Sequence, residues 1–158
     1  MSKLSPNSDF KLSPRPTSNS TETVYAGGTA YQLTQTPALL NLGTTPASIV
    51  LNSPGTYLLL SRARLDYNAA TFAAVRTVSL KLRRINNTAA DVTGATSSLL
   101  TQIITLLTFT AGYVVLPPVI YTTLNSNDNI QVFGSVDTLP TAGTFDVSEA
   151  EIVAIKLS

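Results

Sequence analysis

The residue types that most often carry catalysis or bind metal are scarce in this chain. It contains no histidine and no cysteine. The absence of histidine excludes Ser-His-Asp triads, histidine acid–base relays and histidine-bound metals, and the absence of cysteine excludes thiol catalysis and the usual structural zinc sites. The sequence also lacks a phosphate-binding loop, a dinucleotide fingerprint and a Gly-x-Ser-x-Gly motif. We therefore expect a protein that is not an enzyme and holds no cofactor.

Paired carboxylates are the remaining residues with catalytic potential. Glycoside hydrolysis needs two acids about 5 to 9.5 Å apart across a sugar cleft. Two groups of acids qualify by position, namely Asp146, Glu149 and Glu151 near the C-terminus, and Asp128 and Asp137 upstream of them. In the plainer interpretation, which we favour for want of a motif, the aspartates shape turns and the glutamates flank a strand. Asp128 and Asp137 are also too isolated to form a calcium site, which needs about six to eight oxygens, so we expect no metal.

Basic and aromatic side chains offer binding rather than catalysis. If the two strands that carry the basic residues pair, these residues form one stripe able to dock on an acidic partner; otherwise they are solvated strand charges. The residues are Arg62, Arg64, Lys81, Arg83 and Arg84. Six tyrosines could anchor an interface, although sheet packing explains most of them. A formal net charge of +1 indicates neither nucleic acid nor a membrane as a partner.

The surface composition indicates self-association. Charged residues make up 12% of the 158 residues and hydrophobic residues 44%, whereas about a quarter of a typical soluble domain is charged. A lone monomer with so few charges would expose much apolar and hydroxyl-rich surface. Copies of the chain are therefore expected to cover part of it.

Short β-branched and aromatic runs between Gly, Pro and Asn clusters position these residues, and no segment sustains a helical period. In 56–67, the alternating residues from Tyr57 through Leu65 to Tyr67 form a core face. In 75–84, Val78, Leu80 and Leu82 do the same. Residues 23–158 thus predict one all-β domain, an antiparallel two-sheet jelly-roll sandwich of roughly eight to ten strands.

Four further segments complete this expectation. Residues 88–98 have turn composition and predict a surface loop, and 99–110 predict a strand. Residues 119–124 and 130–136 predict a hairpin, in which Ile130, Val132 and Val136 share one face. The last strand, 151–157, is expected to point Val153, Ile155 and Leu157 into the interior.

Residues 1–22 predict a flexible N-terminal arm, because their serines, prolines and few large apolar groups do not offset the entropy of ordering. One interpretation is a tail without a role. In the other, the arm binds a partner through apolar residues on a basic tether: Leu4, Phe10, Leu12, Lys11 and Arg15. The arm lacks the apolar core of a signal peptide, so we expect synthesis in the cytoplasm.

The order of these features resembles the C1q and tumour-necrosis-factor jelly-roll superfamily, especially stand-alone versions from tailed bacteriophages. The resemblance covers about residues 24–158 and rests on SPGTYLLLSRARLDY, VRTVSLKLRRINN, VIYTTLNSNDNIQVFGSVD and EAEIVAIKLS. Gly55-Thr56-Tyr57 matches a Gly-x-Tyr strand start. Asn127-Asp128-Asn129 replaces a turn that normally contains Gly, and the last strand lacks the family's aromatic residues.

The resemblance implies a homotrimer, with Tyr57, Ile152, Ile155 and Leu157 at the trimer interface. It also implies a structural virion protein that decorates or cements a phage capsid, so that the partners are other copies of the chain and a major capsid or other virion protein. The expected location is the virion. The alternative is a receptor-binding or fibre-tip module that recognises cell-surface carbohydrate.

Overall fold

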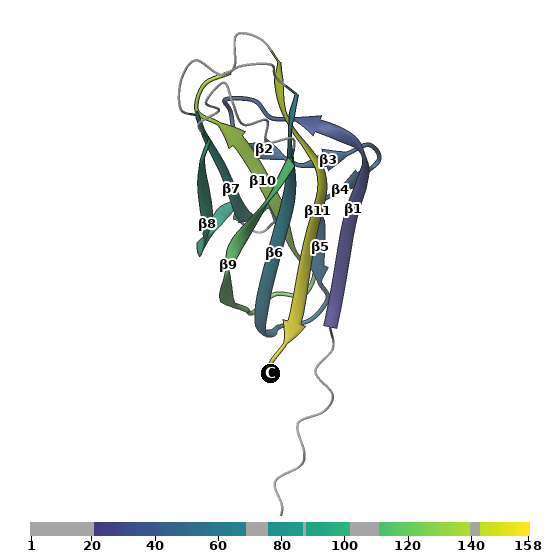
Figure 1. The fold of residues 1–158 in the computed structure, drawn as a ribbon. Coiled ribbons are helices and arrows are strands. Elements are labelled where there is room, and N and C mark those ends of the chain that lie inside the picture. The colour runs from purple at the N-terminus through teal and green to yellow at the C-terminus, as the bar shows by residue number, and fades with distance from the viewer. Residues whose placement is uncertain (1–20, 69–75, 87, 102–110, 140–142) are drawn as a thin grey trace, which may run out of the picture.

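A computed structural model describes residues 21–68, 76–86, 88–101, 111–139 and 143–158. Throughout these ranges the chain forms strands and turns (Figure 1). The two larger sheets are antiparallel and pack face to face as a sandwich. The predicted all-β jelly-roll architecture is confirmed. None of the described segments is a helix long and apolar enough to cross a membrane.

Sheet A contains four long strands, of which β11 and β6 are central and β1 and β9 form the edges. Their order is β1 (Thr21–Gln32), β11 (Thr144–Lys156), β6 (Gly55–Asn68) and β9 (Ala111–Thr123). Each neighbouring pair is antiparallel. The first and last strands of the described chain therefore lie side by side, and Thr21 pairs with Ile155 at one end of the sheet.

Sheet B lies behind sheet A and is built around β10. Its order is β2 (Ala38–Leu39), β10 (Asp128–Val136), β7 (Arg76–Arg84) and β8 (Ala90–Thr101), and β5 (Ser48–Leu51) pairs with the start of β10. A small hairpin joins β3 (Asn41–Leu42) and β4 (Thr45–Pro46). β8 and β9, which belong to different sheets, form adjacent edges of the sandwich.

The core lies between the sheets, where the alternation of the long strands places it. On β6, Tyr57, Leu59 and Leu65 are buried, as predicted, and on β7 the inward residues are Val78, Leu80 and Leu82. The predicted shared face of β10 is also confirmed, because its members are all buried: Ile130, Val132 and Val136. Burial of apolar area at about 25 cal/mol per Å² is the main driving force for this arrangement.

The prediction that residues 88–98 form a surface loop is wrong. Residues 90–98 belong to β8, which pairs with β7 from Arg84↔Ala90 to Arg76↔Thr101. Val92 and Ala95 are buried, and Gly94 adopts a φ of 81° where the register shifts. The hydroxyl-rich composition reflects a strand with one wet face and an irregularity, which propensity alone interprets as a loop. Of the predicted strand 99–110, residues 102–110 lie outside the described residues.

The predicted hairpin of 119–124 with 130–136 is also wrong. The first segment belongs to β9 in sheet A and the second to β10 in sheet B, so the turn between them crosses from one sheet to the other. Asn127 takes the left-handed conformation, with a φ of 61°, at the turn between β9 and β10. Beside it, the buried Asp128 carboxylate accepts hydrogen bonds from the Tyr121 hydroxyl at 2.7 Å and the Thr123 hydroxyl at 2.6 Å. These bonds tie the end of β9 to the start of β10.

Two adjacent prolines lie within a single strand instead of separating two. Pro117 and Pro118 fall in β9, where the partner residue changes from Val119 opposite Leu59 to Leu116 opposite Ser61. Proline donates no backbone hydrogen bond, so an edge strand with a bulge is the place where a sheet tolerates it. The bulge leaves Leu60 of β6 opposite the prolines, and this local gap shapes the surface described below.

The last strand turns toward the core the face opposite to the one that we predicted. Ala150, Ile152 and Ala154 point into the core, whereas Val153 and Ile155 lie on the outer face of sheet A. Leu157 follows the strand and is 41% exposed. Alternation was ambiguous because both faces of 152–155 are apolar, and β11 also carries a register shift between Val147 and Glu149.

The predicted arm, residues 1–22, lies outside the described residues except for Thr21 and Glu22. These two residues belong to β1, and their partners on β11 are Ile155 and Ala154. β1 therefore begins two residues before the predicted domain boundary at residue 23. The partner-binding residues predicted in the arm lie outside the described residues: Leu4, Phe10, Lys11, Leu12 and Arg15.

Candidate functional site on the outer face of sheet A

Rows of side chains cross the outer face of sheet A, because paired residues of antiparallel strands project on the same side. The first upper row contains Gly27, Glu149, Arg64 and Tyr113, and the second contains Tyr25, Glu151, Arg62 and Val115. The first lower row contains Thr23, Val153 and Leu60, which faces the proline bulge, and the second contains Thr21, Ile155, Leu58 and Ile120. The upper rows are charged and aromatic, and the lower rows are apolar.

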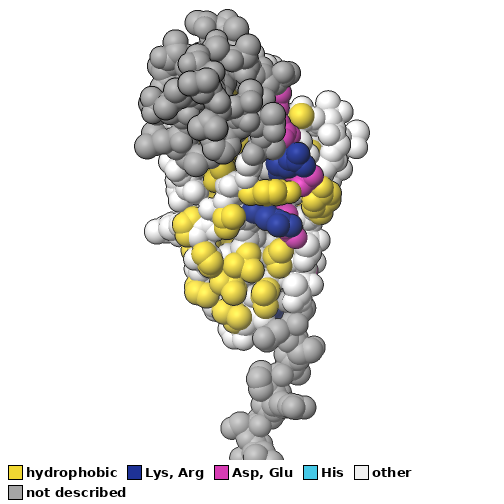
Figure 2. Space-filling model, in the orientation of Figure 1, with side chains coloured by type: hydrophobic (Ala, Val, Ile, Leu, Met, Phe, Trp, Pro, Cys, Tyr) yellow, Lys and Arg dark blue, Asp and Glu magenta, His cyan; other side chains and the backbone are white. Residues whose placement is uncertain are grey.

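The lower rows form a contiguous apolar patch. Figure 2 shows this patch as yellow side chains over β9, β6 and β11, below a band of alternating charges. Val115, which extends the patch from the row above, is 63% exposed, and Ile120 is 59% exposed. Leu58, Leu60 and Val153 are half-buried by their neighbours on the sheet. Contiguous exposed apolar surface of this kind marks an interaction site more often than single exposed residues do.

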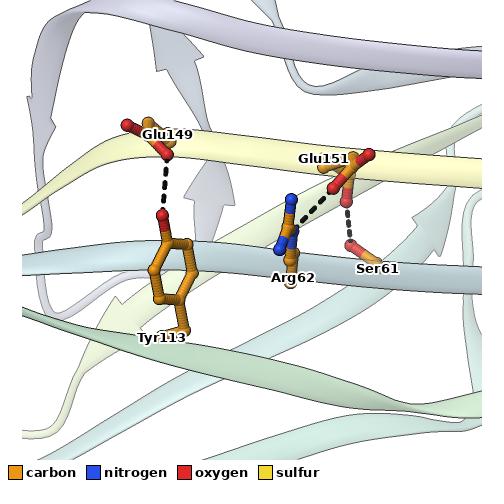
Figure 3. A network of polar contacts seen from close by, with 5 residues as sticks. All are labelled: Ser61, Arg62, Tyr113, Glu149 and Glu151. Carbon is orange, nitrogen blue, oxygen red and sulfur yellow. Dashed lines mark hydrogen bonds and ion pairs between the residues drawn. The ribbon is translucent and has the colours of Figure 1, made fainter.

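The upper rows form a charged band whose members bind one another within the chain (Figure 3). Nε of Arg62 lies 2.6 Å from Oε2 of Glu151, and Nη1 of Arg64 lies 3.4 Å from Oε1 of Glu149. The Tyr113 hydroxyl donates to Oε2 of Glu149 at 3.1 Å, and the Arg62 guanidinium lies 5.5 Å from the centre of the Tyr113 ring. Each carboxylate of the two rows therefore has a cationic partner from the neighbouring strand β6.

Arg64 is the most heavily paired cation of the band. Besides Glu149 it contacts Asp66, with Nε 3.3 Å from Oδ1. The charge of Asp66, followed by that of Glu149, raises the pKa of Arg64 above its usual value against a smaller opposing effect of desolvation. The Arg64 guanidinium is therefore charged at neutral pH.

A hollow of about 290 Å³ lies where the charged band meets the apolar patch. Its apolar walls come from Leu60, Val115, Pro118 and Val153, and the Arg62 and Glu151 pair forms its polar rim. Beneath the rim, the Ser61 hydroxyl donates to the backbone oxygen of Glu151 at 2.8 Å. The hollow exists because the Pro117-Pro118 bulge removes a paired residue opposite Leu60.

The four residues expected at a trimer interface divide into two groups. Tyr57 is 3% exposed and Ile152 is fully buried, so both contribute to the core of the protomer and present no surface to another copy. The Tyr57 hydroxyl donates to the backbone oxygen of Ser53 at 2.7 Å within the same chain. Ile155 lies on the outer face of sheet A, and Leu157 is exposed beside it.

The candidate catalytic carboxylates have structural partners. Glu149 and Glu151 belong to the charged band, and Asp128 is buried against Tyr121 and Thr123. Backbone hydrogen bonds, chiefly from Thr77, lower the pKa of Asp137. Among the described residues, no three acids lie close enough together to hold a metal ion.

The alternative in which the basic residues of β6 and β7 form one stripe is wrong, because these strands belong to different sheets. Arg62 and Arg64 lie on sheet A, whereas Lys81 and Arg83 pair with Asp91 on sheet B, at 2.8 and 3.9 Å. Arg84 donates from Nε to the backbone oxygen of Thr88 at 3.0 Å. The charges are thus solvated strand charges in two separate groups.

Sequence reasoning missed Val153 as a surface residue, because it assigned this side chain to the interior. One signal was present: Glu149 and Glu151 are in phase with Val153 and Ile155, so a wet or partner-facing side of β11 could have been assigned. The run Leu58-Leu59-Leu60 likewise indicates a strand that is apolar on both faces.

Several solved structures match this fold, while no family model and no curated protein matches the sequence. The globular domain of zebrafish complement 1qA protein has a TM-score of 0.51 and 10% identity, over 89% of this chain and 98% of that chain. Eiger TNF from S. frugiperda has a TM-score of 0.53 and 11% identity, over 89% and 93%. A chain of the infectious bursal disease virus Gx strain has a TM-score of 0.54 and 9% identity, over 89% of this chain and 33% of that chain. The protein thus has a C1q/TNF-like jelly-roll fold, an architecture that also occurs in that virus structure.

Proposed function

We propose that this chain is a structural virion protein, a homotrimeric jelly-roll that decorates or cements a phage capsid. The observation that carries the proposal is the outer face of sheet A, where an apolar patch adjoins charges that are already paired within the chain. Such a face can lose its water without leaving an unpaired charge, which is the main penalty of burying polar groups.

The pairing of the band favours a second copy of the chain over a strongly charged partner. Arg62, Arg64, Glu149 and Glu151 neutralise one another, so little net field remains to attract an acidic or basic surface. Apolar surface with few free charges is typical of the interfaces between subunits that stay associated. The low charge content of the whole chain agrees with this interpretation.

The attachment to a capsid is assigned to the arm. Thr21 pairs with Ile155 at one end of sheet A, so in a trimer with its axis along the strands all three arms are joined to the domain at the same end. We propose that Leu4, Phe10 and Leu12 bind the capsid protein there, with Lys11 and Arg15 adding charge complementarity. The protein would then be located in the virion, and the receptor-binding alternative stays a prediction.

Two measurements test this function. Native mass spectrometry of the purified chain is expected to give three times the mass of 16.7 kDa, and a monomer at micromolar concentration would contradict the trimer. In co-sedimentation with capsids that lack the protein, the full chain is expected to pellet and a variant lacking residues 1–20 to remain in solution. Because the deletion leaves β1 intact, the melting temperature of the variant serves as the control for folding, and undiminished binding would contradict the role of the arm.

A further inference from the structure

We propose that the hollow between β6 and β9 receives Tyr25 of a neighbouring copy, so that the subunits join head to tail. This inference rests on the proposed trimer and assigns its contact. Tyr25 lies on β1, at one edge of sheet A, whereas the hollow lies on the outer face of the sheet, where residues of β11, β6 and β9 line it. The interface would therefore join two different surfaces of the same chain.

The register of the sheet places the two surfaces at the same height. Tyr25 pairs with Glu151, Glu151 with Arg62, and Arg62 with Val115, so one row contains Tyr25 and three of the residues that line the hollow. A cyclic assembly whose axis runs along the strands brings together features of equal height on neighbouring copies. Such an assembly needs no sliding of one subunit along another to align Tyr25 with the hollow.

The side chain of Tyr25 is suited to act as the inserted group. It is 57% exposed, although tyrosine can bury a large apolar ring. Gly27 lies next to it, and a Cβ atom added at Gly27 would lie 2.9 Å from Cε1 of the ring. The glycine thus leaves space for the ring to lie against the strand at the edge of the sheet, and a larger residue there would displace it.

The chemistry of the hollow matches both ends of a tyrosine. Leu60, Pro118 and Val153 supply apolar walls for the ring, and the Arg62 and Glu151 pair supplies donors and an acceptor for the hydroxyl. Aromatic residues that fill a desolvated pocket with a satisfied polar tip are typical interface hot spots. Ser61, beneath the rim, is occupied with the Glu151 backbone.

Within its own chain, Tyr25 does not line the hollow, because its ring lies along β1 beside Gly27. Adjacent strands are about 4.8 Å apart, so three strand intervals separate the backbone of β1 from that of β9 by about 14 Å. A contact between Tyr25 and the β9 side of the hollow, where Val115 and Pro118 lie, would therefore come from another copy. A contact of this heterologous kind closes into a ring when the rotation between copies matches the symmetry.

Cysteine crosslinking tests the contact cleanly, because the natural chain has no cysteine. The variant Thr23→Cys with Val115→Cys keeps Tyr25 and places one thiol near each edge. An intrachain disulfide is excluded, since disulfides need Cα atoms closer than about 7 Å. After mild oxidation, a non-reducing gel is expected to show covalent dimers and trimers for the double variant and monomers for each single variant.

Substitution of the inserted residue gives a second readout. Tyr25→Ala is expected to raise the dissociation constant of the trimer about 30-fold, the effect of losing one hot spot, while Tyr25→Phe retains most of the affinity. In a variant whose hollow is filled by Val153→Phe, Tyr25→Ala should have little additional effect. The melting temperature of the dilute monomer serves as the control for folding, because Tyr25 lies outside the core.

The outcomes separate this inference from the proposed function. A wild-type trimer whose double cysteine variant does not crosslink and whose affinity is insensitive to Tyr25→Ala would overturn the contact and leave the trimer in place. Crosslinking of a single variant would indicate that identical edges meet around a two-fold axis, which would overturn the head-to-tail arrangement. A monomeric wild-type chain would overturn both proposals.

Discussion

The outer faces of the two sheets have opposite characters although their inner faces share one core. On sheet B the outward residues are mostly hydroxyl, amide or charged: Ser79 and Ser98 bond across strands at 3.1 Å, and Lys81 pairs with Asp91 at 2.8 Å. The main exception is Phe133, whose ring lies under Arg83, with 5.6 Å between the guanidinium and the ring centre. On sheet A the outward residues are an apolar patch and a self-neutralised charged band.

This difference shows that the apolar character of the outer face of sheet A is not required by the fold. A sandwich needs one buried face per sheet, and sheet B shows that the other face of such a sheet can be wet. Leucine and valine on the outer face of sheet A add little to the stability of one isolated protomer, because much of their area stays in contact with water. Their physical role is best explained by a partner that covers them.

The largest expected effect on association comes from a charge placed on the outer face of sheet A, compared with a charge placed on the outer face of sheet B. Val153→Asp introduces a carboxylate into the centre of the apolar patch, where association would strip it of water, so the dissociation constant of the trimer should rise at least about 100-fold. Ser79→Asp is the matched control on sheet B and should leave association unchanged. Sedimentation velocity over a concentration series measures both, and equal effects of the two variants would contradict the assignment of the interface to sheet A.

A smaller effect is expected from removing one cation of each face. Arg62→Ala leaves Glu151 without its partner in a region that becomes buried on association, which should weaken the trimer by about 3 kcal/mol. Lys81→Ala removes an exposed pair and should change stability by less than about 1 kcal/mol, without effect on association. The double variant Arg62→Ala with Glu151→Ala should recover part of the lost affinity. Failure of Arg62→Ala to affect the trimer would place the charged band outside the interface.

The smallest effect concerns Asp137, which follows the end of β10 in sheet B. Its pKa is lowered in the folded state, so its carboxylate adds stability above the ordinary pKa of about 3.9, and this contribution is lost as the pH falls through the lowered value. Asp137→Asn should therefore lower the melting temperature slightly at pH 7 and by less at pH 3. Association should not change, because the residue lies on the sheet B side. If the difference in melting temperature between Asp137→Asn and the natural chain grew on acidification, this account would be contradicted.

The strands whose two faces differ were predictable from the sequence. β7 alternates between Leu80 or Leu82 and polar residues, and its inward face follows directly from that period. β11 was predicted as a strand with the wrong face inward, because Ile152, Val153 and Ile155 offer no contrast between its two sides. This error assigned Val153 and Ile155 to the core, although the resemblance also placed Ile155 at a trimer interface.

Pairing between segments distant in sequence was not predictable. The segments 119–124 and 130–136 are neighbours in the chain and read as a hairpin, yet each pairs with a strand from elsewhere: β9 with β6, and β10 with β7. Similarly, Arg64 and Glu149 are far apart in sequence, and only the β6 and β11 pairing brings them to 3.4 Å. Local propensity carries no information about which strand lies next to which.

The sequence by itself determined the absence of histidine and cysteine chemistry, the all-β class, the scarcity of charge and most of the core periodicity. These properties depend on residue types and on spacing along one strand, which are local. Only the tertiary structure decided that the two pairs of arginine and glutamate neutralise each other, that Leu58 and Leu60 share a surface with Val153, and that Tyr25 lies in the row of the hollow. These depend on the register of four strands, which is set by the burial of their common inner face.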